Sequence, residues 1–145
     1  MGALIDTSLL IALERQARET TVHLGRLLAS ALESTLDPDE EVAISEVTAS
    51  ELLHGVHRAT SEHRSRREAF VEGVLWAVPT KPFDLRAARI HARIWAQLAA
   101  SGSDIGPHDR IIAGTAISLG WRVITGNRRP FTCRDLEVTT PATLT

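Results

Sequence analysis

The stretch "GALIDTSLLIALER" (residues 2–15) decides how this chain begins to fold. Its apolar start predicts a short buried strand, and "TSLLIALER" predicts a helix capped by Thr7 or Ser8. Asp6 stands between the two, at the carboxyl end of the strand. Because an unpaired buried carboxylate is unfavourable, Asp6 either lies at the end of an element or is held by a positive group.

Short strands and helices alternate along the rest of the chain. The expected strands are 2–6, 42–45, 121–127 and 136–141, with 77–83 as a short strand or an extended link. The expected helices are 7–15, 21–33, 46–59, 61–76, 84–100 and 107–120. Ser45 and Asp84 are the expected caps of the helices that follow them. This alternation predicts an α/β fold with a short, mainly parallel central sheet flanked by helices.

One helix has a definite expected apolar stripe. Its members, on the helix that Asp84 caps, are Leu85, Ala88, Ile94, Trp95 and Leu98.

The composition is that of an ordinary water-soluble globular protein. The 145 residues predict one domain, with 43% hydrophobic and 23% charged residues and a formal net charge of −2. Of the 16 basic residues only Lys81 is a lysine, and arginine suits phosphate and carboxylate partners, although genome composition explains the bias as well.

Cys133 is the only cysteine, so no internal disulfide forms. With neither a signal peptide nor a membrane-spanning stretch in the sequence, we expect a cytoplasmic protein without membrane contact.

Three acids and an amide are the candidate site residues. Asp6 and Asn127 each end a strand, and ligand sites of open α/β sheets lie at the carboxyl ends of strands. Asp109 lies in the first turn of a helix, on the face that carries the core residues. Glu51 lies two turns into the helix that follows the second strand. Taken singly, each is also explained as a helix cap, a surface residue or a turn residue.

Together, these oxygen ligands are what magnesium and manganese prefer. No glycine-rich phosphate loop accompanies them, which argues against a nucleotide as the ligand. Competing sites are weaker: His54 and His57 as a zinc pair, and Cys133 with His108 as a nucleophile pair. A phosphatase with Asp6 as its nucleophile would need an aspartate where Ser8 stands or a late lysine. The basic cluster Arg64, Arg66 and Arg67 is either a solvated helix face or a contact with RNA or a partner.

The chain resembles the PIN-domain ribonucleases, and most closely the VapC toxins of bacterial VapBC toxin–antitoxin pairs. The matching stretches are "LIDTSLLIALE" (4–14), "ISEVTASELLHGV" (44–56), "IGPHDRIIAGTAISLGWRVITGN" (105–127) and Phe131. The resemblance implies a single PIN domain over 1–145, with the family's three-layer fold. It also implies a Mg²⁺- or Mn²⁺-dependent endoribonuclease that slows translation and growth. A VapB-type antitoxin would inhibit it with a segment, often carrying a basic side chain, placed in the acidic site.

The family's site residues carry over position by position. The metal ligands are Asp6, Glu51 and Asp109, and Asn127 falls where many PIN domains have a fourth acid. Whether one or two ions bind therefore stays open. Thr7 and Ser8 match the family's hydroxyl positions next to the first acid and are expected to position the substrate. Apart from the family pattern, we expect Arg110, Arg128 and Arg129 at the rim to hold the RNA backbone, and Asp104 to be an extra acid at the rim. The resemblance further implies a homodimer, for which we expect Phe70, Val74 and Trp76 on the helices from 47 to 76. The alternative to an enzyme is a catalytically silent PIN-like module that binds RNA or protein.

Overall fold

The structure is a computed structural model that describes residues 1–19, 24–103 and 105–142. Its centre is a five-stranded sheet in the order β3-β2-β1-β4-β5. The strands are β1 (Gly2–Ile5), β2 (Glu41–Ser45), β3 (Thr80–Lys81), β4 (Arg122–Ile124) and β5 (Val138–Thr139). Every pair of neighbouring strands is parallel, so all the carboxyl ends meet at one edge of the sheet. The expected α/β fold with a parallel central sheet is confirmed.

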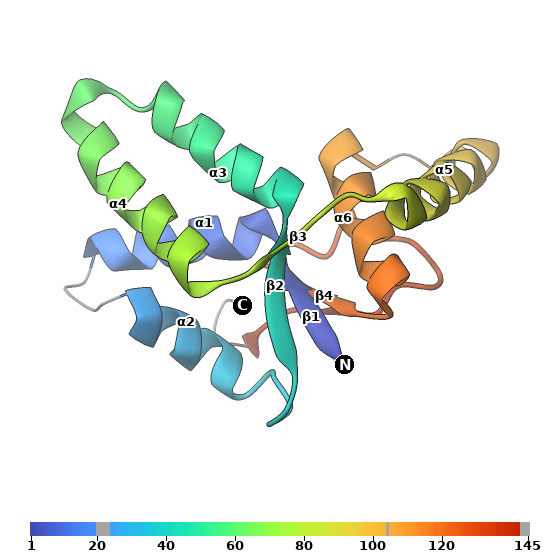
Figure 1. Ribbon diagram of the computed structural model, residues 1–145, viewed down its shortest axis with the longest axis horizontal. Coiled ribbons are helices and arrows are strands. Elements are labelled where there is room, and N and C mark those ends of the chain that lie inside the picture. The colour runs from blue at the N-terminus through green and yellow to red at the C-terminus, as the bar shows by residue number, and fades with distance from the viewer. Residues whose placement is uncertain (20–23, 104, 143–145) are drawn as a thin grey trace.

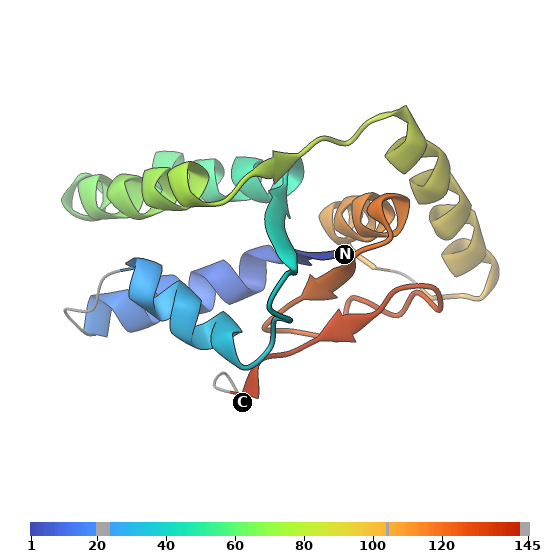
Figure 2. The same cartoon turned by 60° about the horizontal axis from the view of Figure 1, so that its bottom comes forward.

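Helices cover both faces of this sheet, which gives three layers (Figure 1). One side carries α1 (Thr7–Glu19), α2 (Leu24–Glu33), α3 (Glu46–Arg58) and α4 (Ser61–Ala77). The other side carries α5 (Leu85–Ala100) and α6 (Pro107–Leu119), as the turned view also shows (Figure 2). Successive side chains of β1 pack against opposite layers of helices. Ala3 and Ile5 pack with α1–α4, and Leu4 packs with α6.

The helix boundaries follow local chemistry that was readable from the sequence. Ser45 caps α3, because its Oγ accepts a hydrogen bond from the Val47 N–H at 3.2 Å. Asp84 caps α5 in the same way, through the Ala87 N–H at 2.9 Å. The prediction that Thr7 or Ser8 caps α1 is wrong, since both residues lie inside its first turn. The predicted start of α2 at residue 21 lies outside the described residues.

The predicted stripe of α5 is partly wrong. Leu85 and Trp95 are 68% and 54% exposed, and the buried face centres instead on Ala87, Ile94 and Leu98. The cause is Gly114 of α6: a Cβ there would lie 3.1 Å from the Cβ of His91 and 3.3 Å from the Ala87 oxygen. That close approach fixes which side of α5 meets α6, and it turns Leu85 and Trp95 toward solvent.

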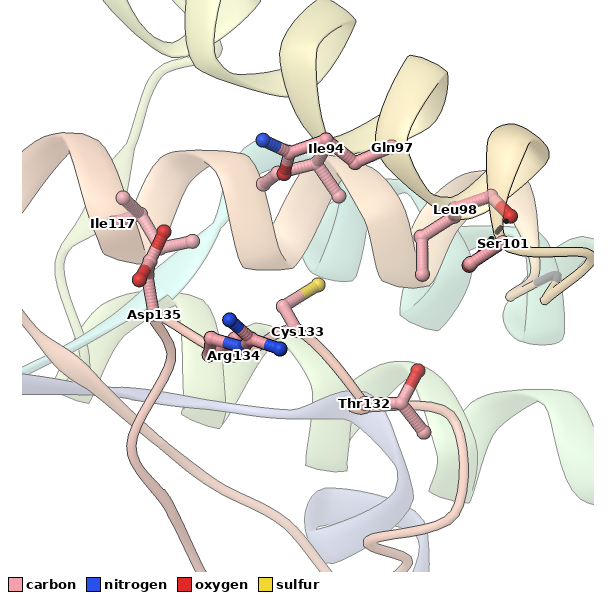
Figure 3. Close-up of a pocket in the computed structure, with 9 residues that line it drawn as sticks. All are labelled: Ile94, Gln97, Leu98, Ser101, Ile117, Thr132, Cys133, Arg134 and Asp135. Atoms are coloured by element: carbon pink, nitrogen blue, oxygen red, sulfur yellow. Dashed lines mark hydrogen bonds between the residues drawn. The ribbon is translucent and has the colours of Figure 1, made fainter.

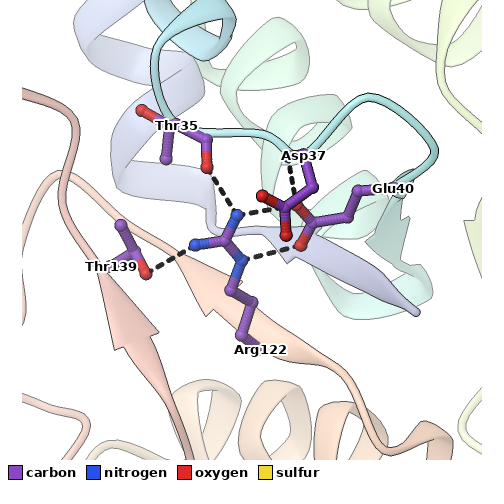
Figure 4. Close-up of polar contacts among 5 residues, drawn as sticks. All are labelled: Thr35, Asp37, Glu40, Arg122 and Thr139. Carbon is purple, nitrogen blue, oxygen red and sulfur yellow. Dashed lines mark hydrogen bonds and ion pairs between the residues drawn. The ribbon is translucent and has the colours of Figure 1, made fainter.

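The amino end of β4 holds an ion pair of Arg122 with Glu40 (Figure 4). The guanidinium makes two hydrogen bonds to the carboxylate, both of 2.7 Å, and donates to the Thr35 oxygen at 2.6 Å and to Thr139 Oγ1 at 3.0 Å. These contacts tie the loop before β2 to β4 and β5. Among the described residues, no helix is both long and apolar enough to cross a membrane.

Candidate active site

The carboxyl edge of the sheet carries a cavity of about 220 Å³. It lies where the chain leaves β1 and β4 and where α3 and α6 approach the same edge. Its lining residues are Asp6, Thr7, Ser8, Ile11, Glu51, Asp109, Asn127 and Pro130. The structure therefore brings the three acids and the amide of the sequence hypothesis to one place.

Asp6 is held by hydroxyl groups. It is only 4% exposed, and its Oδ2 accepts hydrogen bonds from Ser8 Oγ and Thr125 Oγ1, both at 2.7 Å. Its N–H donates to the Ile124 oxygen at 2.8 Å, which fixes the backbone against the end of β4. Asp6 thus sits at an element's end, where two hydroxyl groups hold its Oδ2 in place.

Glu51 is oriented by Thr7 from the first turn of α1. Thr7 Oγ1 donates to Glu51 Oε1 at 2.9 Å and also lies 3.1 Å from the Oγ1 of the buried Thr48. The second oxygen of Glu51 lies 3.5 Å from His108 Nδ1 at the start of α6. One half-buried carboxylate therefore connects α1, α3 and α6.

Asp109 completes the acidic group from the first turn of α6. Three residues on its face, Ile112, Ala113 and Ala116, are fully buried, so the helix is anchored with Asp109 over the cavity. Burial raises the pKa of Asp109, and the negative charges of Asp6 and Glu51 raise it further, while His108 lowers it. The cavity therefore holds more negative charge than its own residues neutralise.

These residues fit a divalent cation by their chemistry. Carboxylate and hydroxyl oxygens are hard ligands, which suit Mg²⁺ and Mn²⁺. Within the described part of the chain, no three His, Cys, Asp or Glu side chains stand close enough to hold one metal ion together. Mg²⁺ is usually bound through one or two carboxylates and several waters, so a cage of three protein ligands is not required.

The remaining predicted site residues have mixed outcomes. Thr7 and Ser8 line the cavity, and Asn127 does too, although its Oδ1 also accepts the Arg129 N–H at 3.2 Å and so stabilises the turn. Arg128 is exposed just beyond that turn. The prediction of a rim position for Arg110 is wrong, because it is 9% exposed and donates to the Ile105 oxygen at 2.6 Å. Asp104 lies outside the described residues.

Two hydroxyls and a histidine of this site were missing from the sequence hypothesis: Thr125, Thr48 and His108. Thr125 is the easiest of the three to predict from the sequence. It directly follows β4, and a hydroxyl at a strand end is placed like Asp6. Thr48 is one turn before Glu51 on α3, which gives no signal by itself. From the sequence, His108 suggests only a partner for Cys133.

The competing sites do not assemble. Cys133 lies in a separate cavity of about 440 Å³ between α5, α6 and residues 132–135 (Figure 3). Burial raises the pKa of its thiol, and Asp135 adds to that effect, so the thiol is poorly suited to be a nucleophile. His108 approaches Glu51 instead. His54 and His57 are exposed on α3.

The fold and the acidic cavity match a known class of nuclease domain. Residues 3–133 match the model of the PIN domain family. A structure described as DNA-bound VapBC from Salmonella typhimurium superposes with a TM-score of 0.77 at 27% identity, over 97% of this chain and 98% of that one.

Two relatives narrow the class. Ribonuclease VapC1 of Rickettsia felis is 35% identical over 144 residues, which cover 97% of this chain and 96% of the relative. The tRNA(fMet)-specific endonuclease VapC of Salmonella typhimurium is 37% identical over 90 residues, or 62% of this chain and 67% of the relative. The chain therefore belongs to the PIN domain family and, within it, to the VapC ribonucleases, the toxins of VapBC toxin–antitoxin pairs. The resemblance noted in the sequence is confirmed.

Proposed function

We propose that this ribonuclease toxin cleaves RNA at the Asp6–Glu51–Asp109 cavity with the help of bound Mg²⁺ or Mn²⁺, acting as a single PIN domain over residues 1–145. The meeting of Asp6, Glu51 and Asp109 in one cavity carries the proposal. In keeping with it, burial and the two neighbouring negative charges raise the pKa of Asp109. An RNA phosphate is repelled by such a group of carboxylates. A divalent cation reverses the local charge, lowers the pKa of a bound water and stabilises the charge of the transition state.

Each residue has a role that follows from its contacts. Asp6 and Asp109 hold the cation, and Glu51 completes the ligand shell or acts through a water. Ser8 orients the Asp6 carboxylate through its 2.7 Å hydrogen bond. Thr7 orients Glu51 through its 2.9 Å hydrogen bond. Asn127, at the edge of the cavity, positions a water or a phosphate oxygen.

The surroundings of the cavity suit a polyanionic substrate and a basic inhibitor. Arg128 and Arg129 are exposed directly after Asn127, so they are placed to bind the RNA backbone. A VapB-type antitoxin inhibits by placing a lysine or arginine near Asp6 and Asp109, where it competes with the cation. Arg110 takes no part in backbone binding, because its guanidinium is engaged inside the protein.

We further propose a symmetric homodimer that uses α4. Trp76 is 92% exposed there, whereas Phe70 is half-buried. The expectation that Val74 contributes to such an interface is wrong, because Val74 is fully buried in the protein's own core. The dimer contact on α4 therefore centres on Trp76.

The decisive experiment is RNA cleavage by protein purified free of contaminating nuclease. Cleavage should require Mg²⁺ or Mn²⁺, stop with EDTA, and fall by at least about a hundredfold in Asp6→Asn, since the change removes a charge worth several kcal/mol to the cation. Asp135→Asn is the matched control, because Asp135 is an exposed carboxylate in the separate Cys133 cavity. EDTA-resistant cleavage, or full activity of Asp6→Asn, would refute the proposal. A catalytically silent binding module would show no metal-dependent cleavage at all.

A further inference from the structure

Thr48 is a fully buried polar side chain that lies one hydrogen bond away from the lining of the acidic cavity. It stands three residues before Glu51 on α3, so the two side chains share one face of that helix. Thr7 of α1 lines the cavity, and its Oγ1 lies 2.9 Å from Glu51 Oε1 and 3.1 Å from Thr48 Oγ1. One hydroxyl of the cavity wall therefore contacts two side chains of α3.

Two other buried hydroxyls on helices bond within their own helix. Thr115 Oγ1 donates to the Ile111 oxygen at 2.8 Å, and Ser118 Oγ donates to the Thr115 oxygen at 2.7 Å, both within α6. Such bonds satisfy a hydroxyl locally. In the described part of the chain, the hydroxyl of Thr48 has its hydrogen bond with Thr7 instead, which belongs to another helix. The hydroxyl of Thr48 therefore serves the cavity wall.

Thr7 has one proton for two acceptors. A threonine hydroxyl donates a single proton, and both Glu51 Oε1 and Thr48 Oγ1 stand within hydrogen-bond distance of it. The bond to the carboxylate is shorter and charge-assisted, so the proton points to Glu51 while this side chain stays in its present place. If Glu51 turns away, the proton rotates to Thr48. Because Thr7 is largely buried, losing both acceptors would leave its hydroxyl unsatisfied, which is unfavourable.

Glu51 is the acid of the cavity that has reason to turn. Among the described residues, no three acidic, histidine or cysteine side chains stand close enough to share a metal ion, so a cation gains a third carboxylate only if side chains move. Two hydroxyls hold Asp6 Oδ2, those of Ser8 and Thr125, whereas Thr7 alone donates to Glu51 Oε1. The hydroxyl that would release Glu51 is also the one that has a second acceptor.

We propose that Thr48 is a positioning residue that accepts the Thr7 proton when Glu51 turns from Thr7 to the cation. Thr7 then keeps a hydrogen bond in both arrangements, first to Glu51 and afterwards to Thr48. This assignment rests on the proposed function, because it names how the same site brings its third acid to the metal.

Mn²⁺ binding without RNA tests this role. Calorimetric titration of full-length Thr48→Val, which nearly keeps the shape but lacks the hydroxyl, should show an affinity roughly three- to tenfold below wild type. That loss lies at the lower end of the usual effect of losing a hydrogen-bond partner of a metal ligand, since Thr48 acts through Thr7. Thr48→Ser should recover most of the affinity. Thr115→Val is the matched control, because Thr115 is an equally buried threonine that bonds within α6, and it should bind Mn²⁺ like wild type.

A double variant separates this role from a merely structural one. Thr7→Val has no proton to transfer, so adding Thr48→Val to it should lower the Mn²⁺ affinity no further. In RNA cleavage, the Mn²⁺ concentration for half-maximal rate should rise in Thr48→Val by the same factor as in calorimetry, with little change in kcat at saturating Mn²⁺. Equal affinity in wild type and Thr48→Val, an equal loss in Thr115→Val, or additive losses in the double variant would overturn the assignment.

A measurement without metal checks the resting arrangement. In EDTA, the NMR signal of the Glu51 carboxylate carbon should shift in Thr7→Val and stay unchanged in Thr48→Val, because Thr7 then still donates to Glu51. A shift in Thr48→Val as well would contradict the exchange of acceptors. Failure of the proposed function shows differently, as the absence of both Mn²⁺ binding and metal-dependent cleavage in wild type.

Discussion

Two carboxylate clusters at opposite ends of β4 have opposite electrostatics. At the amino end, Arg122 binds Glu40, and this hydrogen bond is the main cause that lowers the pKa of Glu40 (Figure 4). At the carboxyl end, Thr125 donates to Asp6, while burial and the charges of Asp6 and Glu51 raise the pKa of Asp109. One cluster is neutralised by a cation of the protein itself. The other is supplied with hydroxyl groups and keeps its excess charge.

The difference separates what holds the fold from what performs the chemistry. The Arg122 side chain is 14% exposed and that of Glu40 5%, and the guanidinium also joins Thr35 and Thr139. Such a pair connects segments far apart in the sequence and has no capacity left for a ligand. The Asp6–Glu51–Asp109 cavity has that capacity, because the charges of Asp6 and Glu51 still raise the pKa of Asp109, so a bound cation or a basic partner would be stabilised there.

Substituting one residue in each cluster, Arg122 and Asp109, gives the largest predicted effects. Arg122→Met should lower the free energy of unfolding by about 3 kcal/mol, because it leaves Glu40 as an unpaired and largely buried carboxylate. RNA cleavage per folded molecule should stay close to wild type. Asp109→Asn should lower cleavage by at least about a hundredfold and leave the fold intact. Urea unfolding and RNA cleavage measured on both variants check this crossover.

Arg134→Met is the control for the first variant, because Arg134 is an exposed arginine on the rim of the Cys133 cavity. It should change neither stability nor cleavage. If Arg122→Met abolished cleavage in molecules that remain folded, the two ends of β4 would not be separable in function.

Thr125 offers a smaller effect that sharpens the comparison at the cavity. Thr125→Val keeps the shape but removes the hydroxyl that donates to Asp6 at 2.7 Å. Metal affinity, measured by calorimetric titration of Mn²⁺, should fall roughly tenfold, as is usual when a hydrogen-bond partner of a metal ligand is lost. Thr125→Ser should restore most of it. Equal affinity in Val and Ser variants would mean that Ser8 alone orients Asp6.

The sequence was sufficient for most of the fold because the decisive signals were local. Caps such as Ser45 and Asp84, and the apolar runs of the strands, depend on neighbouring residues. Asp6 and Asp109 could be found because one stands at a strand end and the other in the first turn of a helix. Glu51 stands in the middle of α3, so its role was indicated chiefly by the resemblance to the family. The parallel strands then had to bring those ends together.

What the sequence missed depended on contacts between distant elements. Arg110 looked like a surface arginine beside Asp109, but its burial follows from the packing of α5 on α6 around Gly114. The same packing turned Trp95 outward, where periodicity had placed it in the core. Ser8 is two residues from Asp6, but Thr125 and Thr7, which donate to Asp6 and Glu51, lie 119 and 44 residues away from them, so no spacing in the sequence relates those pairs.

The smallest predicted effect is a pair of opposite pH dependences in protein without divalent cation. The pKa of Asp109 is raised above its ordinary value of 3.8, so the folded state binds the proton more tightly than the unfolded state. Stability from this group is therefore lost as pH rises from about 3.8 through the raised pKa. Asp109→Asn removes that loss, so the variant should unfold a few degrees higher than wild type at neutral pH, by roughly 2–4 °C.

Glu40→Gln should show the opposite trend. The pKa of Glu40 is lowered from 4.5, so its stabilisation is present above that value and disappears as pH falls through the lowered pKa. The difference in stability between Glu40→Gln and wild type should therefore shrink in acid. The difference for Asp109→Asn also shrinks there, but it has the other sign: at neutral pH Glu40→Gln is less stable than wild type and Asp109→Asn is more stable. Thermal unfolding from about pH 3 to pH 7 with EDTA measures both.

Saturating Mg²⁺ should then stabilise wild type more than Asp109→Asn, because a ligand stabilises only the folded form that binds it. If Mg²⁺ raised the unfolding temperature of both proteins equally, Asp109 would not be a ligand, and the excess charge of the cavity would need another explanation.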